Sequence, residues 1–105
     1  MLVLIMSGAG IYSLVNLTID VELEISNNSF FAFLSEDGDL IVTGAVDNSG
    51  FLSLENIYGT TTFVGSFVNQ STGALTSFIE DESQLVFQGG IVNNGIFSVG
   101  GATFN

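Results

Sequence analysis

The acidic side chains are the residues of this sequence whose type and spacing could do chemistry. Two clusters stand out, each confined to a few positions: Glu36, Asp37 and Asp39, and then Glu80, Asp81 and Glu82. Carboxylate oxygens are hard ligands that suit Ca²⁺, so one interpretation is a calcium site at these clusters. The spacing matches neither an EF-hand loop nor a calcium-binding nonapeptide repeat. Acidic corners exposed to solvent are therefore the favoured interpretation, and calcium stays open as the alternative.

The residue types that are missing exclude most enzyme chemistry. The sequence has no His, Cys, Lys or Arg, so the usual nucleophile and acid–base constellations cannot be built. Paired carboxylates alone could cleave sugars, but such enzymes need a substrate groove, and no connection here is long enough to build one. We expect no enzyme activity, and no cofactor apart from the calcium alternative.

The charge is one-sided and limits the partners. Eleven carboxylates and no cation give a net charge of −11, so the chain cannot neutralise phosphates, and nucleic acid is excluded as a partner. Apolar residues make up 47% of the chain and charged ones 10%, which disfavours disorder.

Residues 1–6 are apolar but too short to cross a bilayer, so no membrane insertion is expected. Residues 1–105 are predicted to form one domain.

A repeating unit organises the chain. Gly44, Gly65 and Gly89 open three copies, and each is followed four residues later by an Asn. A period near 20 residues is typical of a solenoid, in which each coil stacks on the last. The prediction is an all-β parallel β-solenoid, a right-handed β-helix of triangular section with about five coils and uncapped ends. A β-sandwich is the alternative, since short strands at this spacing also suit it.

Alternating apolar residues predict the strands and the core. Residues 17–25 alternate throughout and predict one half-buried strand. Stacking the repeats predicts three inward columns: Ile25/Val46/Phe67/Ile91, Phe31/Leu52/Leu75/Phe97 and Val42/Phe63/Phe87/Phe104.

The recurring asparagines predict a buried ladder. Asn27, Asn48, Asn69 and Asn93 would bond one another and the turn backbone, since buried amides are satisfied only as a row. The simpler interpretation is that Asn tolerates the turn conformation. Three glycosylation sequons begin at Asn16, Asn27 and Asn69; only Asn16 lies off the ladder, and an unmodified side chain is favoured there.

The units Gly44-Ala-Val-Asp-Asn-Ser-Gly50 and Gly89-Gly-Ile-Val-Asn-Asn-Gly95 resemble the β-helical repeats of filamentous haemagglutinin and autotransporter adhesins. The resemblance covers residues 23–105. It implies a structural protein outside the cell or at its surface, with no catalytic residue. Those proteins run to many coils with dedicated caps, whereas this chain has about five coils and no evident cap.

Self-association is the function that follows from these expectations. Uncapped ends would stack chain on chain through Leu2, Leu4, Met6, Thr103, Phe104 and Asn105. An outward apolar column would make lateral contacts through Phe30, Phe51 and Ile96. The expected function is a structural subunit of an extracellular filament, fibre or sheath. The alternative is a monomeric adhesin or a glycan-binding fragment of a longer β-helix.

Overall fold

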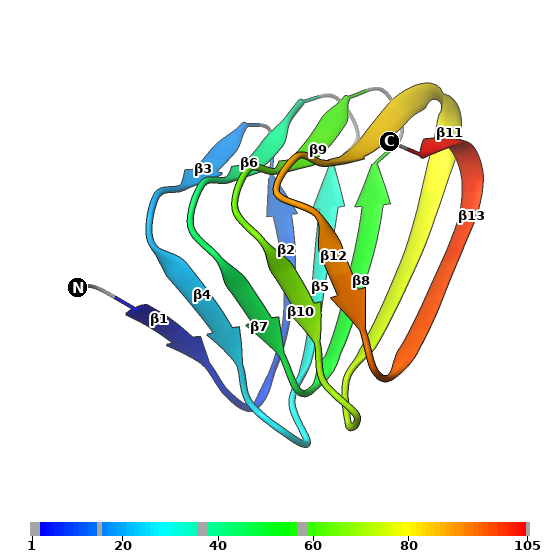
Figure 1. Ribbon diagram of the computed structural model, residues 1–105. Coiled ribbons are helices and arrows are strands. Elements are labelled where there is room, and N and C mark those ends of the chain that lie inside the picture. Colours follow the sequence, from blue (N-terminus) through cyan, green and yellow to red (C-terminus); the bar gives the residue numbers. More distant parts are fainter. Residues whose placement is uncertain (1–2, 15, 36–37, 57–58, 105) are drawn as a thin grey trace.

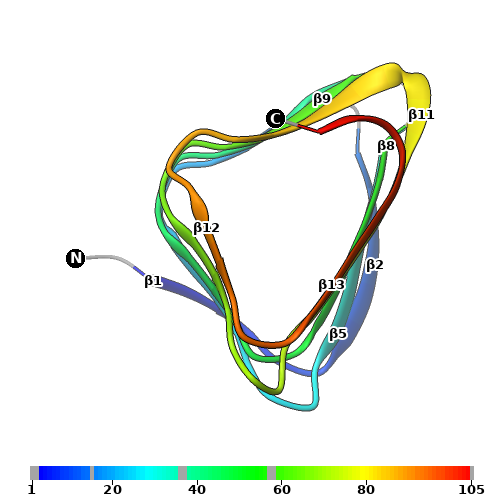
Figure 2. The ribbon, with the colours of Figure 1, turned by 45° about the vertical axis from the view of Figure 1, so that its right-hand side comes forward.

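The computed structural model describes residues 3–14, 16–35, 38–56 and 59–104. It is a parallel β-solenoid whose chain winds along three faces and then repeats the course one level higher (Figures 1 and 2). All strand pairs are parallel, which rules out the antiparallel sandwich. Among the described residues there is no helix that could cross a bilayer.

The first face is a sheet of five short strands: Val3–Met6 (β1), Glu22–Ile25 (β4), Val46–Asn48 (β7), Phe67–Asn69 (β10) and Ile91–Asn93 (β12). Because β1 and β12 occupy the same position within the coil, on the first face, four complete turns separate them. About five coils were predicted, and the count agrees if the coil that starts at β12 is included. The right-handed course stays a prediction.

The second and third faces share the longest strands. The second face is formed by Ala9–Leu14 (β2), Phe30–Ser35 (β5), Phe51–Asn56 (β8) and the first parts of Ala74–Phe87 (β11) and Ile96–Phe104 (β13). The third face is formed by Leu17–Ile19 (β3), Leu40–Val42 (β6), Thr60–Phe63 (β9) and the second part of β11. In Figure 2, β11 turns the corner between these two faces without a break, and the triangular outlines of successive coils superpose.

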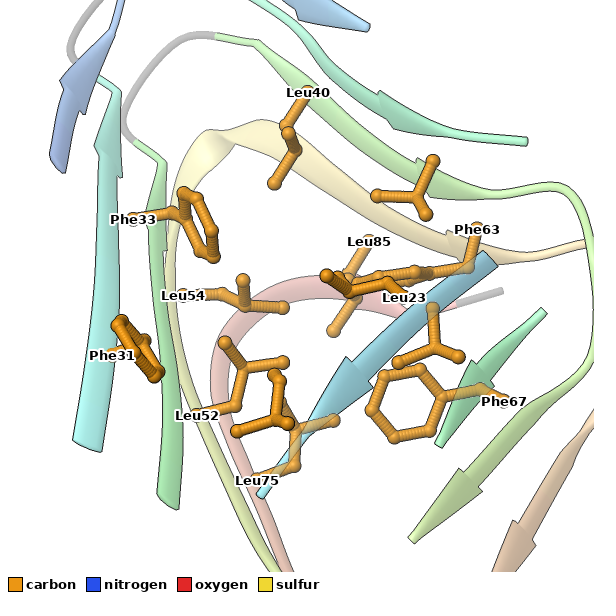
Figure 3. Close-up of a cluster of buried hydrophobic side chains, with 13 residues drawn as sticks. Leu23, Phe31, Phe33, Leu40, Leu52, Leu54, Phe63, Phe67, Leu75 and Leu85 are labelled. Carbon is orange, nitrogen blue, oxygen red and sulfur yellow. The ribbon is translucent and has the colours of Figure 1, made fainter. Parts of the chain in front are cut away.

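The core fills the triangle with stacked apolar side chains (Figure 3). The predicted column Phe31/Leu52/Leu75/Phe97 is confirmed by the strand register. In the other two columns one member each is wrong. Leu23, not Ile25, is opposite Val46. Phe104 pairs with Leu85 rather than with Phe87.

The single strand predicted for residues 17–25 is also wrong, because the chain turns a corner inside it. Leu17–Ile19 lies on the third face and Glu22–Ile25 on the first. The alternation of apolar residues runs straight through the corner at Asp20 and Val21, so it gives no sign of the change of face.

Candidate functional surfaces

Three asparagine side chains form a row of hydrogen bonds at the corner between the first and second faces. Asn48 and Asn69 are fully buried, and Asn93 is exposed. Asn48 Nδ2 donates to Asn69 Oδ1 at 2.9 Å, and Asn69 Nδ2 donates to Asn93 Oδ1 at 2.8 Å. Asn48 and Asn69 both donate toward the C-terminal end of the solenoid, so the row has a direction.

The same amides hold the corner backbone, and the Gly of each Asn-x-Gly unit is required because a Cβ on Gly50 would lie 2.5 Å from Ser26 O and one on Gly95 would lie 2.2 Å from Gly73 O. The N–H of Gly50 donates to Asn48 Oδ1, and that of Gly95 donates to Asn93 Oδ1, each at 3.2 Å. Asn69 Nδ2 also donates to the carbonyl oxygen of Ile96 at 2.9 Å. Buried amides that are satisfied in this way specify the corner, and leaving them unpaired is costly.

Asn27 is not part of this row, and its predicted place in the ladder is wrong. Ile25 pairs with Asn48, while Asn27 lies exposed in a turn in which Asn28 has a φ of 63°. The cause is a longer corner. Ser29 follows Ile25 by four positions, whereas the equivalent Gly50 follows Asn48 by two, so counting back by 21 residues from Asn48 ends two residues too late, at Asn27.

The acidic corners contain only one carboxylate whose position is described. Asp39 Oδ1 accepts a hydrogen bond from the N–H of Thr60 at 2.8 Å, and the N–H of Asp39 donates to Asn16 Oδ1 at 2.9 Å. Asp39 therefore connects its own coil to the preceding coil through Asn16 and to the following coil through Thr60. Glu36 and Asp37 lie outside the described residues, and Glu80, Asp81 and Glu82 are placed only as part of β11. Within the described part of the chain no three acidic side chains gather as metal ligands would.

The N-terminal end of the solenoid is an open apolar surface. A hollow of about 640 Å³ is lined there by Leu4, Ile5, Met6, Ser7, Tyr12, Leu17, Ile19, Phe31 and Phe33. Leu4 is 42% exposed although it belongs to the inward column of Leu23. In Figure 2 the start of β1 swings away from the outline shared by the other strands of its face, which leaves the core open at this level.

Tyr12 is the exposed aromatic residue of this surface, whose lining also includes the buried Phe31 and Phe33. The repeat register of the sequence includes Tyr12, but no function was predicted for it. Its ring stacks on those of Phe31 and Phe33, with centroids 6.2 and 5.5 Å away, and it is 45% exposed. Alternation in β2 indicates that Tyr12 points inward, but its role follows only from the strand pairing, because nothing in the described chain stacks on its other side.

Of the other residues predicted to join one chain to the next, the structure describes some and not others. Leu2 and Asn105 lie outside the described residues. Thr103 pairs with Gln84, and Phe104 with Leu85, at the end of β13. Met6 packs half-buried against the core.

The predicted lateral residues do lie in one row on the second face. Phe30 pairs with Phe51, Phe51 with Ala74, and Ala74 with Ile96. The rings of Phe30 and Phe51 stack at 4.9 Å, with an angle of 12° between their planes. Phe30 is 42% and Ile96 65% exposed.

No protein-family model, curated protein or solved structure matches this chain. The stacked parallel coils agree with β-helical repeats as a class. The narrower resemblance to filamentous haemagglutinin and autotransporter adhesins gains no support from these comparisons.

Proposed function

We propose that this chain is a structural subunit that polymerises by stacking its solenoid end to end, as part of a filament, fibre or sheath. The observation that carries the proposal is the open apolar hollow at the N-terminal end. A core that reaches solvent in this way is stabilised when another apolar surface covers it.

Unpaired strand edges support the same proposal. Within the described residues, β1, β2 and β3 each pair with a strand on one side only, as do β12 and β13 at the other end. An open edge is a template for another strand, and in a parallel solenoid the natural addition is a further coil. The edge strands at the N-terminal end are mostly apolar and carry no charged side chain, and Lys residues that would discourage pairing are absent from the sequence.

The two ends also suit each other in register. A copy placed on the N-terminal end as one more coil would bring its Ile91 onto Leu4 and its Phe97 onto the position of Gly10, next to the exposed ring of Tyr12. Ile91 and Phe97 are half-buried side chains packed on the core. Aromatic and aliphatic groups would thus continue the core across the junction.

A proposed location outside the cell or at its surface rests on the repeat-level resemblance alone. Antibody labelling of intact and of permeabilised cells would test it. Labelling that requires permeabilisation would contradict it.

The first prediction tests the junction by placing a charge in the hollow. Leu4→Asp should abolish long polymers in negative-stain microscopy and leave small soluble particles, because a buried unpaired carboxylate opposes the contact. Thr62→Asp is the matched control, since it adds the same charge on the outer side of β9, away from both ends. Polymers of unchanged length in Leu4→Asp would mean that assembly uses another surface. A parent chain that stays as dispersed particles would favour the monomeric adhesin.

A further inference from the structure

All the charged side chains of this molecule lie between its two end coils. The eleven carboxylates fall between Asp20 and Glu82, so residues 1–19 and 83–105 contain no charged side chain. The first coil consists of β1, β2 and β3, and the last consists of β12 and β13 (Figure 1). Each end can therefore meet a second copy without burying a carboxylate side chain, which would be costly in a chain that has no cation.

A second copy added as the next coil would set uncharged residues opposite each other. The strand registers determine which residues meet, because equivalent positions stand in one column from the first coil to the last. The facing pairs, from the last coil to the first coil of the next copy, are Val92 with Ile5, Asn93 with Met6 and Ile96 with Ala9. Asn93 is the polar residue of this set, so its hydrogen bonds decide how well the two coils fit.

Inside the chain, each buried amide of the asparagine row has two acceptors in the following coil. Asn48 Nδ2 donates to Asn69 Oδ1 at 2.9 Å and to the carbonyl oxygen of Ala74 at 3.2 Å. Asn69 Nδ2 donates to Asn93 Oδ1 at 2.8 Å and to the carbonyl oxygen of Ile96 at 2.9 Å. Ala74 begins β11 and Ile96 begins β13. One step of the row thus has one side-chain acceptor and one backbone acceptor.

Asn93 ends the row, and its Nδ2 has no acceptor within the described part of the chain. Its Oδ1 is fully used, because it accepts from Asn69 Nδ2 and from the N–H of Gly95. In the next copy the side-chain acceptor would be replaced by Met6, whose thioether sulfur accepts only weakly. The backbone acceptor would be present, since Ala9 begins β2 on the second face.

We propose that the asparagine row crosses the junction between stacked copies with one of its two hydrogen bonds missing. Asn93 Nδ2 donates to the carbonyl oxygen of Ala9 in the next copy, and Met6 leaves the other N–H of this amide without a strong acceptor. This inference rests on the proposed end-to-end stacking, and it identifies Asn93 and Met6 as the residues that set its direction and limit its strength. Because a buried donor without a partner is costly, the junction is weaker than the steps within the chain, and polymers lengthen and break there.

The direction follows from the sense of the row. Asn48 and Asn69 both donate toward the C-terminal end, so the donor without an acceptor lies at that end. Two C-terminal ends brought together would present two such donors, and each Asn93 Oδ1 already accepts two hydrogen bonds. Two N-terminal ends would meet without an amide of the row. A C-terminal end covered by an N-terminal end repeats the arrangement found inside the chain.

The corner at Met6 has a length that suits an asparagine of the row. Ala9 begins β2 three positions after Met6, as Phe51 begins β8 three positions after Asn48. Met6 is half-buried and packs on the core. An asparagine at this position would stand in line with the row, where its Oδ1 can accept from the preceding copy.

The second prediction restores the missing hydrogen bond. Met6→Asn should strengthen assembly about tenfold relative to Met6→Leu, because it gives Asn93 of the preceding copy a second acceptor. Met6→Leu is the matched control, since it keeps an apolar side chain of similar size. Light scattering over a concentration series measures the assembly constant. A junction held by apolar contacts alone predicts the reverse order, so assembly of Met6→Asn that is no stronger than that of Met6→Leu would overturn the proposal.

A substitution at Asn93 shows whether the gain depends on its amide. Asn93→Asp keeps the acceptor that Asn69 Nδ2 uses but removes the donor, so the gain from Met6→Asn should be lost in this background. The gain should persist in the Asn94→Asp background, which adds the same charge at the neighbouring exposed residue. Because each gain is measured within one background, the effect of the added charge cancels. Circular dichroism confirms that each variant is folded. Equal gains in the two backgrounds would show that Asn93 is not the donor.

Cross-linking tests the direction without altering the asparagine row. The chain has no Cys, and Ala9 and Ile96 are exposed, so each accepts a single cysteine. Within one chain the two positions lie four coils apart, roughly 19 Å, whereas across the junction they face each other. A short bismaleimide should link Ala9→Cys to Ile96→Cys in a mixture of the two variants. Self-linking of Ile96→Cys as efficient as this mixed product would contradict the direction.

The outcomes separate this inference from the proposed function. Polymers of the parent, together with no gain from Met6→Asn, would sustain the polymer and refute the crossing of the row. A parent that stays dispersed, together with a Met6→Asn variant that polymerises, would support the interrupted row and refute the polymer as the form of the parent chain. Dispersed particles of both would refute both.

Discussion

At the scale of single residues, Asn69 is the centre of the corner. It accepts from Asn48 Nδ2 and donates to Asn93 Oδ1, to the carbonyl oxygen of Gly73 at 3.3 Å and to that of Ile96. All of this happens at a fully buried position, so replacing the amide leaves several groups without partners at once.

The third prediction follows from this burial. Asn69→Leu should lower the free energy of unfolding by about 3 kcal/mol or more, because the buried amide of Asn48 loses one of its two acceptors and the carbonyl oxygens of Gly73 and Ile96 lose a donor. Asn27→Leu is the control in an exposed turn and should change it by less than about 1 kcal/mol. Urea unfolding measures both. Equal midpoints for the two variants would show that the row contributes nothing to stability.

The sequence predicted the asparagine row except at one residue. The common distance from each opening Gly identified Asn48, Asn69 and Asn93. Asn27 was assigned wrongly because a corner can lengthen by two residues without changing which side chains point inward. Only pairing with the neighbouring coil distinguishes Ile25 from Asn27, and this contact is not visible in the local pattern.

At the scale of the strands, local alternation was a good guide to faces and a poor guide to corners. It predicted β5, β8 and their inward column, because strands of six residues leave little freedom of register. It failed at residues 17–25, where two three- to four-residue strands meet at a corner that keeps the same alternation. It also failed for Phe104, because β11 and β13 contain an irregularity between Ile79 and Gln84 that shifts the register.

Glycines mark one of the corners because coils approach closely there. A Cβ atom on Gly65 would lie 2.8 Å from the carbonyl carbon of Gly44, and one on Gly89 would lie 2.4 Å from that of Gly65. Backbone atoms cannot move aside as a flexible side chain can. The repeated Gly is therefore a condition for stacking one coil on the next, and this explains why it recurs with the period of the solenoid.

The fourth prediction concerns Gly65, the middle one of the three stacked glycines Gly44, Gly65 and Gly89. Gly65→Ala should lower the free energy of unfolding by about 2 kcal/mol or more, since two coils must separate to admit the methyl group. Ser66→Ala changes the exposed neighbouring residue and serves as the control. Thermal unfolding of both variants provides the comparison. A Gly65→Ala protein as stable as the control would show that the corner can expand.

At the scale of the whole molecule, the period of about 20 residues predicted the solenoid, because stacking requires equivalent residues at equal distances along the chain. The surfaces that meet a partner were harder to predict. Whether an apolar residue at an end is covered depends on the course of β1, and the role of Tyr12 depends on what stacks above and below it. Neither follows from alternation within one strand.

The distribution of charge over the molecule leads to the last prediction. Eleven carboxylates and no cation repel any second copy, and in an end-to-end stack Glu24 of one copy would lie four coil spacings, roughly 19 Å, from Asp47 of the next. The screening length falls from about 30 Å at 0.01 M, which is longer than this separation, to about 3 Å at 1 M ionic strength, which is much shorter. The concentration needed for assembly should therefore fall as NaCl is raised over this range, as measured by light scattering.

Two comparisons make this test specific. The double variant Glu24→Gln with Asp47→Asn removes two charges from the first face, so its assembly should depend less on salt than that of the parent. MgCl₂ and CaCl₂ at equal ionic strength should act alike if screening alone is responsible. A response to Ca²⁺ far beyond that to Mg²⁺ would instead favour a calcium site at the acidic corners. Polymers that dissolve as salt is raised would contradict the account, because they would have to be held by attraction between charges, and the sequence provides no cation for it.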